Sequence, residues 1–183
     1  MRLRYQMVTV AAIALAGACA VEPAQPAEDG DLYLLFVQQW RPELCFQSEA
    51  PACKHYGDNL VTIHGIWPEF TNGSYPTYCT QEQLTEDIVA PIESELEVAW
   101  PSLAGSTDFE FWSHEFEKHR TCWQGVADTE YFQTALMWRA NLQLANIVEE
   151  SVEIGTPISL DEAVRAVSAG VGTKVYFNCS HGK

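Results

Sequence analysis

Positively charged residues are scarce in this chain. Ten Lys and Arg stand against 25 Asp and Glu, so the formal net charge is −15 at pH 7. Proteins that hold nucleic acid tightly neutralise its phosphates with many cations. The composition therefore argues against tight, non-specific binding of nucleic acid, DNA included. An enzyme that must release its product still tolerates such a charge if its cleft is locally positive.

An apolar run long enough to cross a bilayer is also missing. The run Val8–Ala18 is too short; it follows Arg2 and Arg4 and leads into the small residues Ala18-Cys19-Ala20. This order of a charged, an apolar and a small-residue region is typical of a secretory signal. We therefore expect residues 1–20 to be a signal peptide and the protein to be secreted or periplasmic, without a membrane span.

A lipid anchor at Cys19 is the disfavoured alternative, since Ala16-Gly17-Ala18 lacks the leucine that is usual in lipoprotein signals. Residues 21–31 (VEPAQPAEDGD) are rich in Pro, Ala and acids without an apolar period, which predicts a disordered leader. Without residues 1–20, eight Lys and Arg remain against 25 acidic residues, a net charge near −17. Residues 32–183 suffice for one domain with a sizeable core but not comfortably for two.

Apolar periodicity predicts an α+β domain with a central antiparallel sheet packed against several helices. Three segments rich in β-branched and aromatic residues are expected to form strands: Asp31–Trp40, Asn59–Trp67 ended by Pro68, and Val175–Phe177. Four segments have helical spacing: 85–98, kinked or divided by Pro91, then 108–120, 129–152, and 160–168 opened by a Ser159–Glu162 capping box.

Cysteines in an exported protein form disulfides more readily than they remain free or bind zinc. If Cys19 leaves with the signal peptide, five remain: Cys45, Cys53, Cys79, Cys122 and Cys179. A disulfide could staple the short loop from Cys45 to Cys53. An odd number leaves one cysteine whose partner must be explained.

The segment FWSHEFEKHRTC (Phe111–Cys122) carries the densest group of chemically active side chains. On a helix with about 100° per residue, one face presents His114, Glu115, Lys118 and His119 together. Zinc is one alternative, but zincins place their histidines at i and i+4, whereas here they are at i and i+5 beside a lysine. An exposed helix with a Glu115–Lys118 ion pair is the other alternative.

A second histidine lies in a different motif. His64 interrupts the apolar strand VTIHGIWPEF, where a lone histidine is more often a core residue than a catalyst. Gly65 leaves room for a ligand to approach the backbone, and Trp67 and Phe70 offer flat faces on which a base can stack. The two motifs together favour a site over incidental histidines.

Both segments resemble those of a known family. His64-Gly65-Ile66-Trp67-Pro68 and His114–His119 are similar to the two active-site segments of the ribonuclease T2 family, and Phe36–Trp40 followed by Cys45 resembles its first strand. The similarity runs in order from Leu32 to Cys179. It implies a metal-independent, cofactor-free, monomeric endoribonuclease that cuts single-stranded RNA through a 2′,3′-cyclic phosphate to 3′-phosphate ends, without acting on DNA.

The resemblance also implies roles for single residues. His119 corresponds to the general base, His64 to the general acid, His114 to a phosphate-binding residue, and Glu115 with Lys118 to the pair that stabilises the transition state. Imidazole suits these tasks because it titrates near neutrality. We expect the acidic surroundings to raise the pKa values of the imidazoles and to favour an acidic to neutral optimum.

The family places base recognition after the first motif, which corresponds here to Trp67, Glu69 and Tyr75. Glu69 stands where the family often has Asp, so the base preference stays open. The resemblance further implies the disulfides Cys45–Cys53 and Cys79–Cys122.

Two features depart from the family pattern. Arg120 replaces a usual Gly, and it either disturbs the helix end or adds a phosphate contact. The closing strand that carries the partner of Cys179 is not present before Lys183. We therefore expect a domain over 32–183 that lacks this strand, either as a natural short form or because the sequence is incomplete.

Two other functions remain open at this point. One is a catalytically weak, ribonuclease-like secreted protein that acts by binding. The other is a hydrolase for a different phosphodiester.

Overall fold

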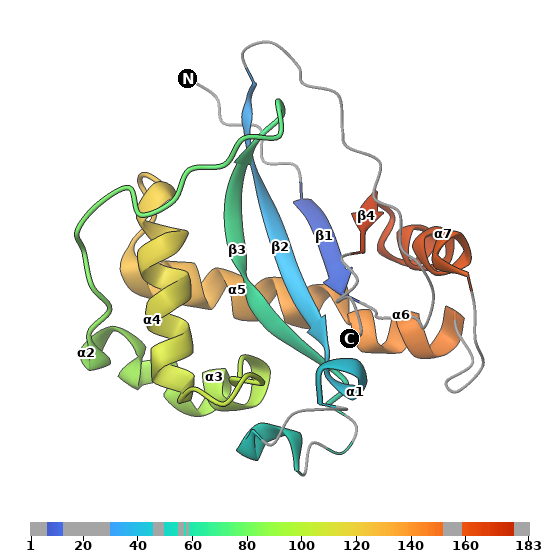
Figure 1. Cartoon of the computed structure of the whole chain (residues 1–183), viewed down its shortest axis with the longest axis horizontal. Helices are drawn as coiled ribbons and strands as arrows, with labels where there is room; N and C mark the ends of the chain where they lie inside the picture. The colour runs from blue at the N-terminus through green and yellow to red at the C-terminus, as the bar shows by residue number, and fades with distance from the viewer. Residues whose placement is uncertain are drawn as a thin grey trace.

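The computed structural model describes residues 7–12, 30–45, 50–54, 57, 59–151 and 159–177. Within these residues, four strands form one sheet in the order β3-β2-β1-β4 (Figure 1). The strands are β1 (Met7–Ala12), β2 (Leu32–Trp40), β3 (Val61–Phe70) and β4 (Val175–Tyr176). β2 and β3 pair antiparallel, whereas β1 pairs in parallel with both β2 and β4. The α+β class is confirmed, and its antiparallel part is the β2–β3 pair.

β3 continues past the proline that was expected to end it. Pro68 lies inside the strand opposite Leu34, and pairing extends to Phe70 opposite Leu32. A proline cannot donate a ladder hydrogen bond, so sheets tolerate it mainly on edge strands. Since β3 is the edge of the described sheet, the expectation was wrong for a simple geometric reason.

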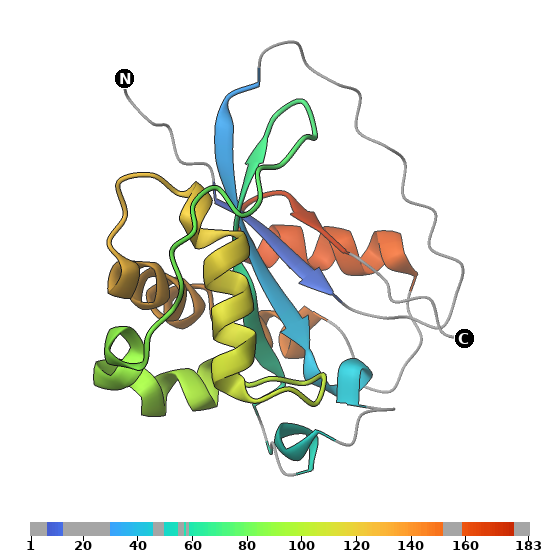
Figure 2. The ribbon, with the colours of Figure 1, turned by 60° about the vertical axis from the view of Figure 1, so that its left-hand side comes forward.

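Helices surround this sheet (Figures 1 and 2). α5 crosses behind the sheet, α4 stands beside β3, and α7 lies on the side of β4. The helical elements among the described residues are α1 (Arg41–Leu44), η2 (Pro51–Cys53), α2 (Glu86–Val89), η3 (Ala90–Ile92), α3 (Glu93–Ala99), α4 (Asp108–Lys118), η4 (Arg120–Cys122), α5 (Asp128–Leu142), α6 (Leu144–Ser151) and α7 (Leu160–Val171).

The sequence predicts the four main helical segments, but not α1 and η2, and it places the ends of α4 and α7 two or three residues away from where they lie. Pro91 divides the 85–98 segment into α2, η3 and α3, and Ser159 with Glu162 forms the expected capping box of α7. The prediction of a single helix over 129–152 is wrong, because the helix is interrupted at Gln143. That residue has φ +45, a left-handed conformation that ends α5 before α6 begins.

Two apolar clusters hold the elements together. The larger joins β2 and β3 to α3, α4 and α5, and its fully buried members include Phe36, Ile66, Trp100, Trp112 and Phe132. The smaller joins the start of β3 to α6, α7 and β4, with members that include Val61, Val148, Val167 and Val175.

Both expected disulfides are present. Cys45 is bonded to Cys53, and Cys79 to Cys122. Cys19 and Cys179 lie outside the described residues. Of the expected signal peptide, Met7–Ala12 is described as β1, and the expected disordered leader lies almost wholly outside the described part. None of the helices described is long and apolar enough to cross a membrane.

Candidate active site

α4 presents its catalytic-type side chains to the sheet because its other face is anchored. Thr107 and Glu110 form a capping box that begins the helix. Trp112 and Phe116 are 1% and 0% exposed in the main core, and the indole of Trp112 donates to the carbonyl of Trp100 at 2.8 Å. With these two aromatic residues buried, Glu115 is directed toward β3.

A β-bulge in β3 sets the direction of His64. Val37 pairs with Gly65 and Gln38 with Ile63, so His64 has no partner across the ladder. An extra residue in one strand re-aims the side chains around it. As a result, both His64 and the Cα of Gly65 face Glu115 instead of alternating across the sheet.

The carboxylate of Glu115 lies at the centre of the site and is 1% exposed. The indole of Trp67 donates to Oε2 at 2.7 Å. Nε2 of His64 lies 3.3 Å from Oε1, and Nε2 of His119 lies 3.9 Å from Oε2. A Cβ at Gly65 would overlap this carboxylate and the Trp67 indole, so only glycine fits there. Glu115 thus links the two histidines through one buried anion.

Gln39 positions the other side of the His64 ring. Its side-chain nitrogen lies 2.6 Å from Nδ1 of His64. The ring also contacts Trp67 and Phe111 edge-on, with centroids 5.1 and 5.3 Å apart. His64 is therefore held on three sides, while its Nε2 faces Glu115.

His119 is the most deeply buried of the three candidate histidines. It is 4% exposed and stacks on Trp67, with centroids 4.9 Å apart and planes 17° apart. Among the described residues, neither of its ring nitrogens has a hydrogen-bond partner. A buried imidazole without partners is costly, and such an exception in a native fold calls for a functional explanation.

The pKa of His119 is lowered to about 4. Burial is the largest cause, and the positive charges of Lys118, His64 and His114 act in the same direction, while Glu115 opposes them. The expectation that acidic surroundings raise the imidazole pKa values is therefore wrong for His119. Desolvation of the ring outweighs the attraction of Glu115.

His114 and Lys118 lie at the rim of the same site. His114 is exposed and Lys118 is half-buried. Both are close enough for their charges to lower the pKa of His119. The fold therefore brings together the five residues of the two motifs, although His114 takes part only through its charge.

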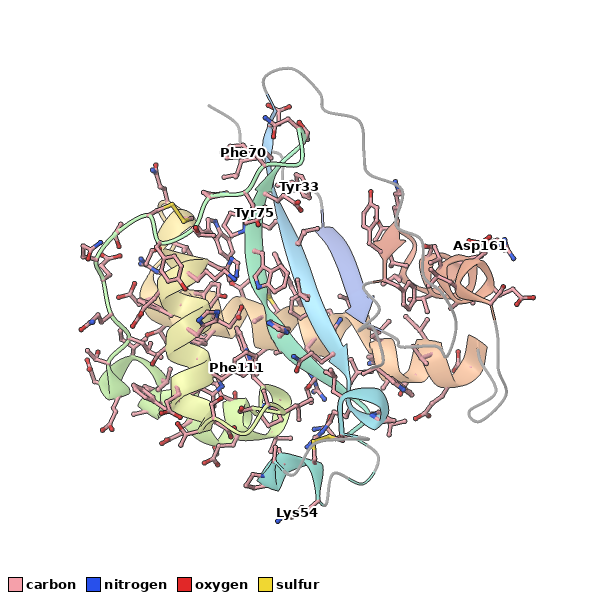
Figure 3. The ribbon with its side chains drawn as sticks, viewed as in Figure 1. Tyr33, Lys54, Phe70, Tyr75, Phe111 and Asp161 are labelled. Carbon is pink, nitrogen blue, oxygen red and sulfur yellow. A yellow bond between two sulfur atoms is a disulfide. The ribbon has the colours of Figure 1, made fainter. Side chains whose placement is uncertain are left out.

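Two hollows flank the histidines. The first has a volume of about 280 Å³ and contains all three expected base-recognition residues; its lining is Leu35, Trp67, Pro68, Glu69, Tyr75, Lys118 and His119. The second, of about 800 Å³, lies on the other side and is lined by residues that include Gln39, His64, Ser102, Ser106 and Phe111. In Figure 3, Tyr75 lies toward the end of β3 that leads into Thr71, and Phe111 lies toward the opposite end.

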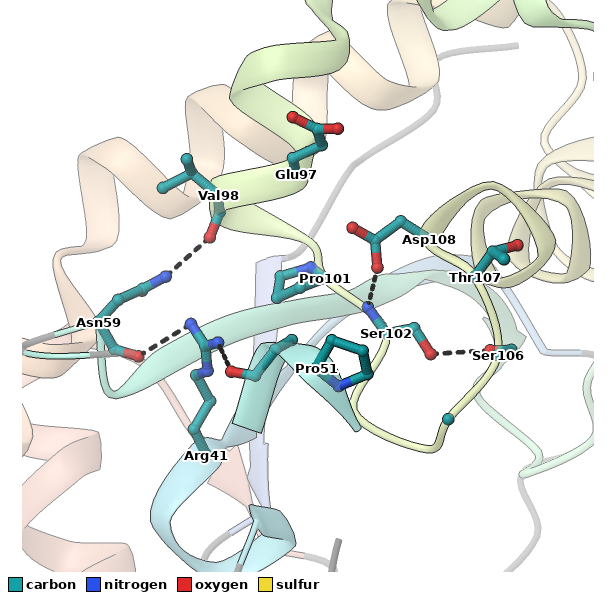
Figure 4. Close-up of a pocket in the computed structure, with 12 residues that line it drawn as sticks. Arg41, Pro51, Asn59, Glu97, Val98, Pro101, Ser102, Ser106, Thr107 and Asp108 are labelled. Carbon is teal, nitrogen blue, oxygen red and sulfur yellow. Dashed lines mark hydrogen bonds between the residues drawn. The ribbon is translucent and has the colours of Figure 1, made fainter. Parts of the chain in front are cut away.

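The second hollow was not foreseen from the sequence. Residues 102–106, which carry no motif, form one part of its wall, and Leu44, Ala50 and Pro51 form another. The 102–106 segment is held by Asp108, whose carboxylate accepts from the backbone nitrogen of Ser102 at 2.7 Å (Figure 4). A third hollow of about 640 Å³ adjoins it, and Figure 4 shows Arg41 there, donating to carbonyls of Asn59 and Ala52. It contains none of the expected site residues.

Arg120 does not follow either alternative suggested by the sequence. α4 ends at Lys118 in a regular way, and the guanidinium forms ion pairs with Glu82 and Asp128. It also lies 5.2 Å from the centre of the Phe116 ring. Arg120 thus fastens the helix end to neighbouring segments, and its charge is neutralised there.

No group of three or more His, Cys, Asp or Glu side chains within the described part of the chain could hold a metal ion.

Comparison with known proteins identifies relatives of this chain. Ribonuclease DdI of Dictyostelium discoideum is 32% identical over 195 residues, covering 100% of this chain and 84% of that protein. Intracellular ribonuclease LX of Solanum lycopersicum is 32% identical over 170 residues, covering 88% and 71%. The crystal structure of RNase NT in complex with 5′-AMP is 33% identical with a TM-score of 0.68, covering 84% and 78%. The model of the Ribonuclease T2 family matches residues 31–183, and the chain belongs to this family.

Proposed function

We propose that this protein is an endoribonuclease that cuts single-stranded RNA by transesterification, using His119 as base and His64 as acid. The observation that carries the proposal is the buried Glu115 carboxylate between two imidazoles, one of which has unpartnered ring nitrogens. The family and the ribonuclease names of its relatives support the activity. The nucleotide bound in the RNase NT structure supports a nucleotide site.

In the first step, His119 takes the proton of a ribose 2′-hydroxyl. The 2′-oxygen forms a bond to phosphorus, the bond from phosphorus to the 5′-oxygen breaks, and His64 gives its proton to that oxygen. A base must be neutral before it accepts a proton. The lowered pKa keeps His119 in that form down to weakly acidic pH.

The charges around the histidines suit the transition state. Lys118 and His114 place positive charge near the phosphoryl oxygens, on which negative charge builds up in the transition state. Glu115 stabilises the positive charge that His119 gains with the proton, as its opposing effect on the pKa of His119 indicates. In the second step the roles reverse: His64 takes a proton from water, which opens the cyclic phosphate to a 3′-phosphate, while His119 returns its proton to the 2′-oxygen.

The two hollows then receive the nucleosides on either side of the cleaved bond. The hollow at His119 takes the nucleoside whose ribose 2′-oxygen attacks. Its base stacks on Trp67 and Tyr75, with Glu69 at the edge of the base. The hollow at His64 and Phe111 takes the leaving nucleoside, since His64 protonates its 5′-oxygen.

We further propose export as a monomer after removal of residues 1–20. The two disulfides support an oxidising compartment. One relative is named an intracellular ribonuclease, so fractionation of cells that express the full chain tests this location directly.

Incubation of the purified protein with single-stranded RNA in excess chelator tests the activity. We expect cleavage with a 2′,3′-cyclic phosphate before the 3′-phosphate, and no change with chelator. Lys118→Ala should lower kcat more than it raises KM. The matched control is Lys174→Ala, which removes a cation that lies over Tyr176 on β4 and should leave both constants unchanged. RNA bound but left intact would favour the binding protein, and loss of cleavage on chelation would favour a metal-dependent phosphodiesterase.

A further inference from the structure

The base-binding hollow has a second layer behind Glu69. Tyr33 on β2 lies directly opposite Glu69 on β3 in the ladder. Its hydroxyl donates to Oε2 of Glu69 at 2.8 Å. Tyr33 does not itself line the hollow, whereas Glu69 does. Any effect of Tyr33 on a bound base therefore acts through the carboxylate of Glu69.

The protonation state of Tyr33 fixes the direction of this hydrogen bond. Burial raises the pKa of Tyr33, and both the bond to Glu69 and the negative charge of that residue raise it further. The phenol thus keeps its proton over the whole physiological range and always acts as a donor. Oxygen Oε1 of Glu69 has no hydrogen-bond partner among the described residues, so it is the one left to a ligand.

The four bases differ in what they offer to a carboxylate. Guanine presents two adjacent N–H donors, which match two free carboxylate oxygens side by side. Adenine and cytosine present one amino group next to a ring nitrogen that only accepts. Uracil presents one N–H between two carbonyl oxygens, and a carboxylate repels both of these oxygens. A carboxylate with one oxygen already bonded keeps a fully free oxygen for a single amino group, but it matches the paired donors of guanine less well.

We propose that Tyr33 is a positioning residue that determines base specificity: by holding one oxygen of Glu69, it favours adenine and cytosine over guanine on the 5′ side of the cleaved bond. The proposal rests on the proposed ribonuclease function. The inference goes beyond that function because neither of the two active-site motifs contains Tyr33.

Hydrolysis of four dinucleotides that differ only in the 5′ base tests this inference. The unchanged protein should give higher kcat/KM for the adenine and cytosine substrates than for the guanine one. Tyr33→Phe frees Oε2, so the ratio of guanine to adenine kcat/KM should rise about tenfold, the effect of one additional hydrogen bond to a charged group. Tyr176→Phe, which removes the hydroxyl of an exposed residue that interacts with Tyr33 but forms no hydrogen bond to Glu69, should leave the ratio unchanged.

The outcomes separate the two proposals. If the unchanged protein cleaves none of the four substrates, the ribonuclease proposal fails. If it cleaves them but Tyr33→Phe lowers all four values equally, Tyr33 has only a structural role and the inference is overturned. In a Glu69→Ala background, Tyr33→Phe should no longer change the ratio, and a persisting change would contradict an action through Glu69.

Discussion

At the scale of single residues, burial decides the chemistry of the site. His119 keeps a low pKa although a carboxylate lies 3.9 Å away, because the ring is desolvated and the interactions with Lys118, His64 and His114 act in the same direction. The two motifs identify which residues meet, but they contain no information on the depth at which each one lies. Net charge was therefore a poor guide to the pKa of this imidazole.

Protonation of His119 should weaken the fold at acidic pH. Its folded-state pKa of about 4 lies below the ordinary value of about 6.5, so the unfolded chain binds the proton first. The stabilising contribution is complete above about pH 6.5 and is lost as the pH falls toward 4, by up to about 3 kcal/mol. Urea unfolding measures the free energy of unfolding at pH 7 and at pH 4.5. Between these two pH values, His119→Gln should lose less of it than the unchanged protein. Equal losses would mean that His119 is not buried as a neutral ring.

Gly65 is the second residue whose role is visible only in three dimensions. Gly65→Ala should displace the Glu115 carboxylate and lower kcat by about 10² or more, because the pair of histidines loses its common partner. Gly170→Ala is the matched control, since its Cβ would overlap Ile147, away from the site. Both variants should lose about 1 to 3 kcal/mol of stability. Equal turnover per folded molecule in the two would contradict the role of Gly65.

At the scale of elements, the sequence predicts what periodicity and capping control. Strands β2, β3 and β4, the division at Pro91 and the capping box of α7 follow from local patterns, whereas β1 was not predicted. The break at Gln143 has no glycine or proline to announce it, and the continuation of β3 through Pro68 depends on the edge position of that strand. The bulge at His64 depends on its pairing with β2, which no local pattern contains.

The two disulfides should contribute different amounts to the free energy of unfolding. Cys79–Cys122 closes a separation of 43 residues and fastens the segment after His119, whereas Cys45–Cys53 closes only 8. The chain-entropy estimate gives about 4 kcal/mol for the first and about 2.5 for the second. Denaturant unfolding should therefore show a larger loss of stability for Cys79→Ala with Cys122→Ala than for Cys45→Ala with Cys53→Ala, and the first pair should also reduce turnover. The reverse order would show that the 79–122 bridge does not fix the helix end.

At the scale of the whole molecule, β1 contributes no residue to the site. The catalytic candidates come from β3, α4 and the residue after it, and none comes from β1. Cleavage after Ala20 would remove β1 and leave β2 and β4 without that neighbour.

A chain that begins at Val21 should therefore retain cleavage activity. Its β2 and β4 amides should exchange with solvent faster than those of the full chain, because the parallel ladders to β1 are lost. Hydrogen exchange and kcat/KM on the two forms measure both effects. A form from Val21 that is folded but inactive would show that β1 supports the site, and would argue against residues 1–20 as a removable signal.

The most direct test of the proposed mechanism is the 2′-oxygen itself. If His119 activates this oxygen as the nucleophile, a substrate with a single deoxyribose at the cleaved position must be inert there, while cleavage continues at neighbouring ribonucleotides. His119→Ala and His64→Ala should each reduce cleavage of the all-ribose substrate by about 10² to 10⁴-fold. We predict that no product arises at the deoxyribose position. Cleavage at that position at a rate comparable to the ribose substrate would contradict transesterification and the role of His119.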